Sequence, residues 1–193
     1  MKKLRKIGVA VICIATFLCL IPLVNRLTRN DLEKAVMSCK KYYEPSWKLD
    51  NIQEDTEQKY IFFKFCYRYK NYGDRFLCIK NTIENLTNIL LEPEDSKWGK
   101  YTLRLGFLNV GDYFDVIVNE KQLQVTTNMN ISVEKIAELF PDTDVLSLYP
   151  ARYNSIIEIQ GFEDLKEIRF SQGLTDEEKA YVWSLFPNCI IED

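Results

Sequence analysis

Alternating apolar and polar positions predict several β-strands in the first half of the chain. In the segment KYIFFKFCYRYK, residues 59–70, the side chains of Ile61, Phe63 and Phe65 share one face. The aromatic residues on both faces of this segment are typical of a central, largely covered strand. Residues 101–107 alternate in the same way, and residues 112–127 have the pattern of a β-hairpin that turns near Asn119. The acidic and polar stretch of residues 51–58 predicts a loop.

Helical spacing predicts two helices around the first strand. Pro45 ends the first of these helices, which has four apolar positions on one face: Leu32, Val36, Cys39 and Tyr43. The second helix ends before Pro93, and its apolar positions recur at intervals of three and four: Phe76, Ile79, Ile83, Leu86 and Leu90. Residues 30–128 therefore predict an α+β unit, with helices packed on an antiparallel-rich sheet.

From residue 132 onward the chain predicts two similar units of helix, proline break and strand. Ser132 is a suitable N-cap for the first helix, and Thr175 and Glu178 have capping-box spacing at the start of the second. A Leu-Phe-Pro triplet ends each helix, at residues 139–141 and 185–187. Short apolar strands are expected after both triplets.

A middle copy of this pattern begins at Phe162, which follows Phe140 by 22 residues and precedes Phe186, where a third copy begins, by 24. From Phe162, apolar residues follow at Leu165, Ile168 and Phe170. This order and period resemble a leucine-rich repeat, over residues 132–193. Ser171-Gln172-Gly173 stands where the family has its asparagine, so the middle copy departs from the family pattern directly after its strand.

The resemblance implies binding of a protein or peptide on the exposed strand face. Matching that face to this chain gives a set of candidate binding residues: Ser147, Tyr149, Lys166, Glu167 and Arg169. Solenoids need about three repeats to bury their own core. We therefore expect residues 132–193 to pack on the preceding unit.

The N-terminus has a basic flank followed by an apolar run. Residues 7–24 carry no charge and, as a helix, would span about 27 Å, close to a bilayer's hydrocarbon thickness. A cleaved signal peptide is the alternative, but the run is long and lacks small residues at a cleavage position. We expect a signal-anchor helix that places the chain in the cell membrane as a single-pass protein. The N-terminal positive charges predict the N-terminus inside and the body outside.

Charge and composition narrow the function. Residues 1–30 hold six basic side chains and no acidic one, which leaves 19 basic and 28 acidic groups in the other 163 residues. An acidic body disfavours nucleic acid as a partner. The chain has no histidine, so the commonest general base and metal ligand are missing. No nucleotide-binding, nucleophile-elbow or zinc motif occurs, and no cofactor or metal is expected.

Cysteine spacing leaves the redox state open. The body contains Cys39, Cys66, Cys78 and Cys189, none in a C-x-x-C motif. They are either small buried side chains or, outside the cell, one or two disulfides.

Three parts and one function follow from these patterns. We expect an anchor in residues 1–29, an α+β unit in 30–131 and a leucine-rich-repeat-like α/β unit in 132–193. The predicted function is a membrane-anchored, extracytoplasmic binding module without catalysis. Two alternatives remain, a subunit of a membrane complex and a histidine-independent cell-surface enzyme that uses carboxylates.

Overall fold

The computed structural model describes residues 31–44, 46–68, 74–149, 157–171 and 173–192. The chain divides after Ser38 into two compact units. In the first unit the described residues form helix α2, Asp31–Ser38, whose first turn carries two carboxylates that suit a helix N-terminus. The single helix predicted up to Pro45 is therefore broken, because the short helix α3, Lys40–Tyr43, starts separately in the second unit.

The predicted membrane-spanning helix of residues 7–24 lies outside the described residues. Among the helices that the structure describes, none is long and apolar enough to cross a bilayer. The predicted transmembrane helix and single-pass membrane topology are therefore wrong. The residues that the structure describes form an α+β body. The location of that body outside the cell depends on the same N-terminal residues and stays a prediction.

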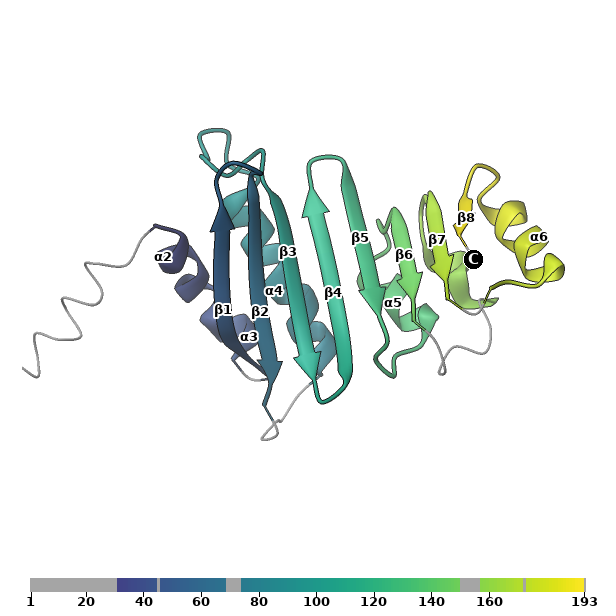
Figure 1. Ribbon diagram of the computed structural model, residues 1–193, viewed down its shortest axis with the longest axis horizontal. Coiled ribbons are helices and arrows are strands. Elements are labelled where there is room, and N and C mark those ends of the chain that lie inside the picture. Colours follow the sequence, from purple (N-terminus) through teal and green to yellow (C-terminus); the bar gives the residue numbers. More distant parts are fainter. Residues whose placement is uncertain (1–30, 45, 69–73, 150–156, 172, 193) are drawn as a thin grey trace, which may run out of the picture. The chain divides into compact units, whose positions relative to one another are not determined.

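The second unit is built on one sheet of eight strands that lie side by side in chain order (Figure 1). Their bounds are β1 Trp47–Asp55, β2 Tyr60–Tyr67, β3 Thr102–Asn109, β4 Asp112–Asn119, β5 Gln122–Thr127, β6 Val145–Leu148, β7 Glu167–Phe170 and β8 Ile190–Glu192.

The sheet is mixed rather than antiparallel-rich, which corrects the predicted fold class. Within the described residues, three neighbouring pairs are antiparallel, namely β1–β2, β3–β4 and β4–β5, whereas the other four are parallel. Parallel neighbours need a crossover. Helical segments lie in the connections between them: α4 Arg75–Leu90, α5 Val133–Leu139, the 3-10 helix η1 Ile157–Gly161, and α6 Asp176–Leu185.

Strand β1 occupies part of the stretch for which the sequence predicts a loop. It pairs with β2 from Trp47 to Asp55, with a bulge between Leu49 and Asn51. The sequence of β1 shows no regular alternation of apolar and polar residues, because β1 is an edge strand and six of its nine residues are exposed. Charged side chains and a bulge are the usual protection of an exposed edge, and they remove the apolar pattern of a covered strand.

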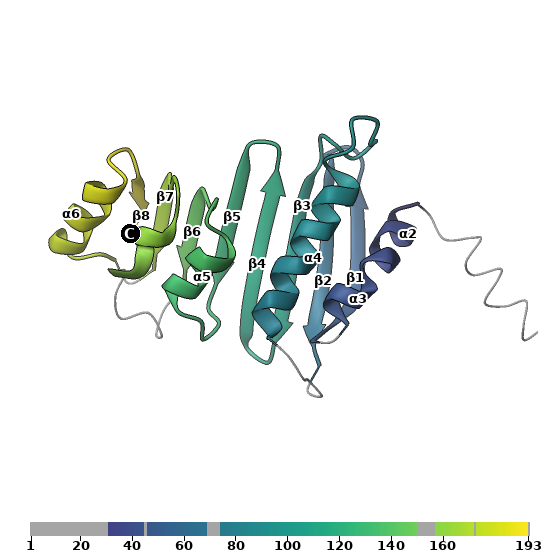
Figure 2. The same ribbon diagram turned by 180° about the vertical axis from the view of Figure 1, so that it is seen from behind.

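Among the described residues of the second unit, α3, α4 and α5 cover one face of the sheet and lie in front of the strands in Figure 2. On this face Phe65, Phe107 and Phe114 are cross-strand partners on β2, β3 and β4. All three are fully buried, and the rings of Phe65 and Phe107 stack with centroids 4.8 Å apart. Burial of such rings stabilises the sheet and its helices, because each ring removes a large apolar area from water.

A single sheet runs through the predicted boundary between residues 30–131 and 132–193, because β5 pairs with β6. Beyond it, β6, β7 and β8 add in parallel order. Ser132 and Thr175 cap α5 and α6, and the capping box of Thr175 with Glu178 is complete, as the spacing predicts. The leucine-rich-repeat resemblance itself stays a prediction.

Candidate functional site

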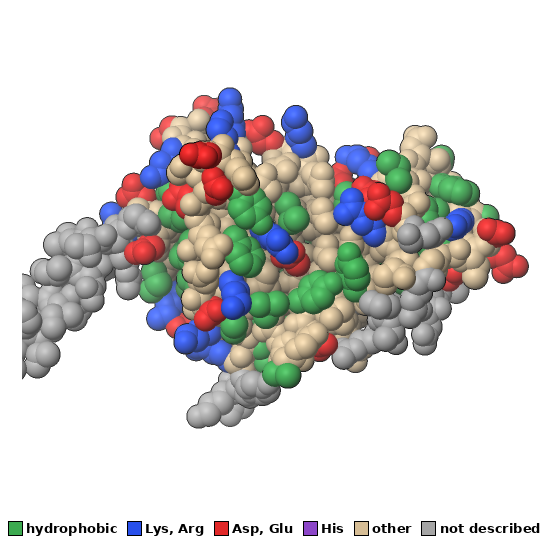
Figure 3. Space-filling view, viewed as in Figure 1, with side chains coloured by type: hydrophobic (Ala, Val, Ile, Leu, Met, Phe, Trp, Pro, Cys, Tyr) green, Lys and Arg blue, Asp and Glu red, His purple; other side chains and the backbone are tan. Residues whose placement is uncertain are grey.

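We define the open face as the side of the sheet that these helices leave uncovered, the side seen in Figure 1. Figure 3 shows that hydrophobic side chains gather over its middle strands, with acidic and basic side chains among them. Two hollows lie here. Both are lined by Leu108 and Tyr113, which are cross-strand partners on β3 and β4.

The central hollow has a volume of about 350 Å³. Its lining comes from β2 to β5 and from the residue after β6: Phe62, Arg104, Gly106, Leu108, Tyr113, Asp115, Thr126 and Tyr149. The rings of Tyr113 and Tyr149 lie 6.2 Å apart at one side. Aromatic rings therefore border the hollow on both sides of β3 and β4.

Gly106 forms the floor of the central hollow. A Cβ atom at this position would lie 3.2 Å from Cε2 of Phe62 and 3.6 Å from Oδ1 of Asp115. Both contacts come from neighbouring strands, β2 and β4. Glycine inside a strand often marks the close approach of another group, and here the missing side chain leaves room for the Phe62 ring.

Arg104 and Asp115 form the charged pair at the hollow. Nε of Arg104 donates to Oδ2 of Asp115 at 2.8 Å and to Oδ1 at 3.1 Å. The Arg104 guanidinium also lies 5.4 Å from the centroid of the Phe62 ring, within cation–π range. The arginine side chain is 46% exposed, whereas the aspartate side chain is 13% exposed.

Burial sets the electrostatics of this pair. It raises the pKa of Asp115 by more than the Arg104 guanidinium lowers it. The hydrogen bond to Asp115 in turn raises the pKa of Arg104. Burial, together with nearby Tyr149 and Asp115, raises the pKa of Tyr113. Both carboxylate oxygens accept from the single Nε–H of Arg104, so the pair offers a fixed polar surface rather than a free general base.

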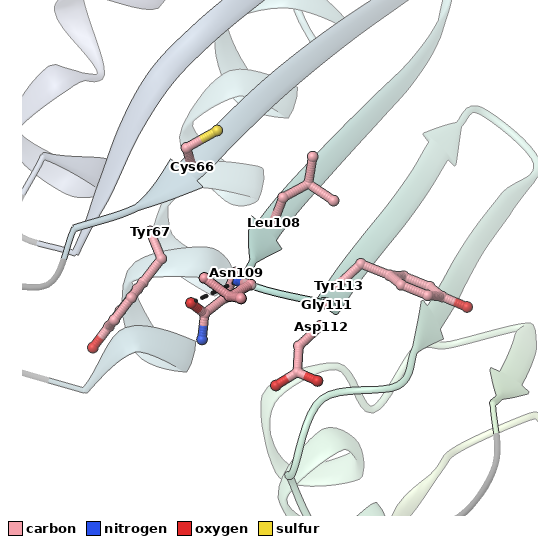
Figure 4. A pocket seen from close by; sticks show the side chains of 8 residues that line it. Cys66, Tyr67, Leu108, Asn109, Gly111, Asp112 and Tyr113 are labelled. Carbon is pink, nitrogen blue, oxygen red and sulfur yellow. Dashed lines mark hydrogen bonds between the residues drawn. The ribbon is translucent and has the colours of Figure 1, made fainter.

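The hairpin hollow, of about 490 Å³, lies beside the β3–β4 turn (Figure 4). Its lining consists of Cys66, Tyr67, Leu108, Asn109, Val110, Gly111, Asp112 and Tyr113. Asn128, the residue after β5, holds the turn. Its Oδ1 accepts from the Tyr113 amide at 2.6 Å, and its Nδ2 donates to the Gly111 carbonyl at 3.1 Å. Gly111 has φ of +76°, which a residue with a side chain rarely adopts. Val110 at the tip is 82% exposed.

The structure separates the five binding residues predicted from the sequence. Tyr149 lines the central hollow and is 41% exposed. Ser147 is buried, and its Oγ makes no hydrogen bond to any described residue. Ser147 and Arg169 are cross-strand partners, and Nε of Arg169 donates to Oε1 of Glu167 at 2.5 Å.

Lys166 precedes β7 and forms an ion pair with Asp144. Of the five predicted residues, therefore, Tyr149 alone lines either of the two hollows described above.

Sequence reasoning did not find the residues of the central hollow on β3 and β4. Two signals were present in the sequence. Residues on the second face of 59–70 include an aromatic ring at Phe62, and Gly106 interrupts an otherwise apolar and polar alternation. Neither signal shows which strands become neighbours, and the parallel pairing of β2 with β3 brings Phe62 opposite Arg104.

The described residues offer little for metal or thiol chemistry. Within the described ranges, no group of three His, Cys, Asp or Glu side chains could hold a metal ion. Cys66, Cys78 and Cys189 carry free thiols in the structure. Burial raises the pKa of Cys189 to about 11, so its reactive thiolate is scarce at neutral pH.

No family model, curated protein or solved structure matches this chain.

Proposed function

We propose that this chain is a non-catalytic binding module that holds a protein or peptide partner on the open face of its sheet. One observation carries the proposal. The helices of the second unit leave one face of the sheet open, and the middle of that face is hollowed and lined by aromatic side chains. A sheet face without helices commonly meets water with polar side chains, so an aromatic hollow there needs another explanation.

The composition of the hollow supports binding. Tyrosine, phenylalanine and arginine are enriched in protein interfaces, and tyrosine and arginine supply much of the binding energy. Tyr113 and Tyr149 have two rotatable side-chain bonds each, so little conformational entropy is lost when a partner packs against them. The hydrogen bond to Asp115 already holds the Arg104 side chain in place. Arg104 therefore loses less conformational entropy when it contacts a partner.

The charges of the open face also favour a recognition surface. Ion pairs there join acidic and basic side chains on the same strand or on adjacent strands: Asp50–Lys64, Asp115–Arg104, Glu167–Arg169 and Glu192–Arg169. Such pairs add little stability when exposed, but they orient polar groups and help to select the partner. The acidic body remains unfavourable for nucleic acid.

Site-specific photo-crosslinking in cells that express the full chain tests the proposal. A photoreactive phenylalanine analogue replaces Tyr149 on the open face, and the same analogue replaces the exposed Glu138 of α5 as the matched control. We expect crosslinked products of defined mass from position 149 and few from position 138. Equal yields at the two positions, or no product at 149, would contradict the proposal.

A further inference from the structure

The two hollows lie one after the other along the β3–β4 pair, and we call them together the trough. The central hollow reaches Arg104, and the hairpin hollow reaches Val110. A strand rises about 3.4 Å per residue, so these positions are about 20 Å apart. Leu108 and Tyr113 line both hollows and therefore lie where they meet. A ligand that fills both hollows must be long and narrow.

The size of each hollow limits what it can hold. Volumes of about 350 and 490 Å³ are at the small end of ligand pockets, which run from about 300 to 1,000 Å³. Each hollow suits one or two large side chains. The two centres, near Gly106 and near Asn109, are about 10 Å apart at the rise of a strand. An extended peptide covers that distance in about three residues.

The charges in the trough select against a charged ligand at the central hollow. Nε of Arg104 donates to both carboxylate oxygens of Asp115, and the guanidinium faces the Phe62 ring. The pair is electrically neutral as a whole, so an additional buried charge would lack a partner and would cost free energy. Aromatic and aliphatic groups make up the rest of the lining, apart from Thr126.

We propose that the trough binds an extended peptide segment of about six residues in the polyproline II conformation, with one large apolar side chain in each hollow. Side chains three positions apart lie on the same side of a polyproline II helix and about 9 Å apart, which matches the spacing of the two hollows. This inference rests on the proposed function and specifies its ligand. The segment lies along the β3–β4 pair, with Leu108 and Tyr113 beneath the stretch between its two anchor side chains. Affinity comes from apolar burial at the anchors, and specificity comes from their spacing.

A library of random nine-residue peptides displayed on phage is the probe, and the full chain is the target. We expect the selected peptides to carry two large apolar residues about three positions apart, with no charged residue between them. Tyr149→Ala changes only the central hollow, and Val110→Ala changes only the hairpin hollow. Both side chains are exposed, so neither variant should unfold the chain. Trp183→Ala, on α6 and 48% exposed, is the matched control.

Double-mutant cycles assign each anchor to its hollow. We expect each trough variant to weaken a selected peptide at least fivefold and the control to change binding less than twofold. Replacing one anchor of the peptide by alanine should abolish the effect of one trough variant and preserve the effect of the other.

Two results would overturn the inference. Peptides that need only one anchor, or that respond to only one trough variant, would show that the hollows do not act together. Peptides that ignore both variants would exclude the peptide segment. If position 149 still crosslinked in cells, the open face would bind a folded protein surface instead, and the proposed function would stand. If crosslinking failed as well, both proposals would fall.

Discussion

At the scale of single residues, Gly106 shows how one missing side chain shapes the open face. Phe62 and Asp115 approach it from β2 and β4, to within 3.2 and 3.6 Å of where a Cβ atom would lie. Glycine in the interior of a strand weakens the strand. At position 106 it also leaves the hollow open, because it has no side chain. The residues that carry the candidate site are thus ordinary aromatic and charged side chains, arranged around a gap.

Tyr43 gives a residue-scale prediction about pH. Burial raises its pKa from 10.0 to about 12, so the folded chain disfavours the phenolate. The stability that neutral Tyr43 contributes is complete below pH 10 and is lost as the pH rises toward 12. When the pH is raised from 8 to 11, the free energy of unfolding should therefore fall by about 1 kcal/mol less in Tyr43→Phe than in the unmodified chain.

Chemical denaturation at the two pH values measures this difference. Tyr42→Phe, at the half-buried neighbouring position, removes a hydroxyl from the same helix and is the matched control. Parallel curves for Tyr43→Phe and the unmodified chain would contradict the assigned burial of the Tyr43 hydroxyl.

At the scale of elements, local signals predicted most helices and strands and the β4–β5 hairpin, but not the pairing of strands that are far apart in the chain. Helix α4 has a regular apolar stripe, and Asp74 caps it by accepting from the amides of Phe76 and Leu77. Such features are local and can be found in one sequence. Strand β1 lacked them because its stability comes from pairing with β2. The candidate site depends on that same non-local pairing, which explains why the sequence indicated Tyr149 but not Arg104 or Asp115.

Helix α6 gives a prediction at the element scale. Oγ1 of Thr175 accepts from the amide of Glu178 at 3.2 Å, and the Glu178 carboxylate accepts from the Thr175 amide at 2.9 Å. Thr175→Ala removes the first bond and should cost about 1 kcal/mol in helix stability. Thr175→Ser keeps the hydroxyl and should cost little.

Amide hydrogen exchange in Asp176–Leu185 measures the effect on α6 directly. Thr175→Ala should exchange about fivefold faster there than the unmodified chain, since 1 kcal/mol is about a fivefold change in an opening equilibrium. Equal exchange in Thr175→Ala and Thr175→Ser would show that the capping box does not stabilise the helix.

At the scale of the second unit as a whole, continuity of the sheet decides where function can lie. Strands from both predicted units, 30–131 and 132–193, pair into one sheet, so the hollow over β3 and β4 also receives Tyr149 from beyond β6. Helices fill one side and leave the other open. The binding surface therefore belongs to the whole sheet rather than to the repeat-like segment alone, where the sequence first indicated it.

Hydroxyl-radical footprinting of the full chain, in cells and after purification, tests the central claim most directly. In the purified chain Tyr149 and the control Trp183 are similarly exposed, at 41% and 48%. If a partner occupies the open face, Tyr149 and Tyr113 should be oxidised several-fold less in cells than in the purified chain, while Trp183 changes little. Equal oxidation of Tyr149 in cells and in the purified chain would show that the open face is bare, and would contradict the account.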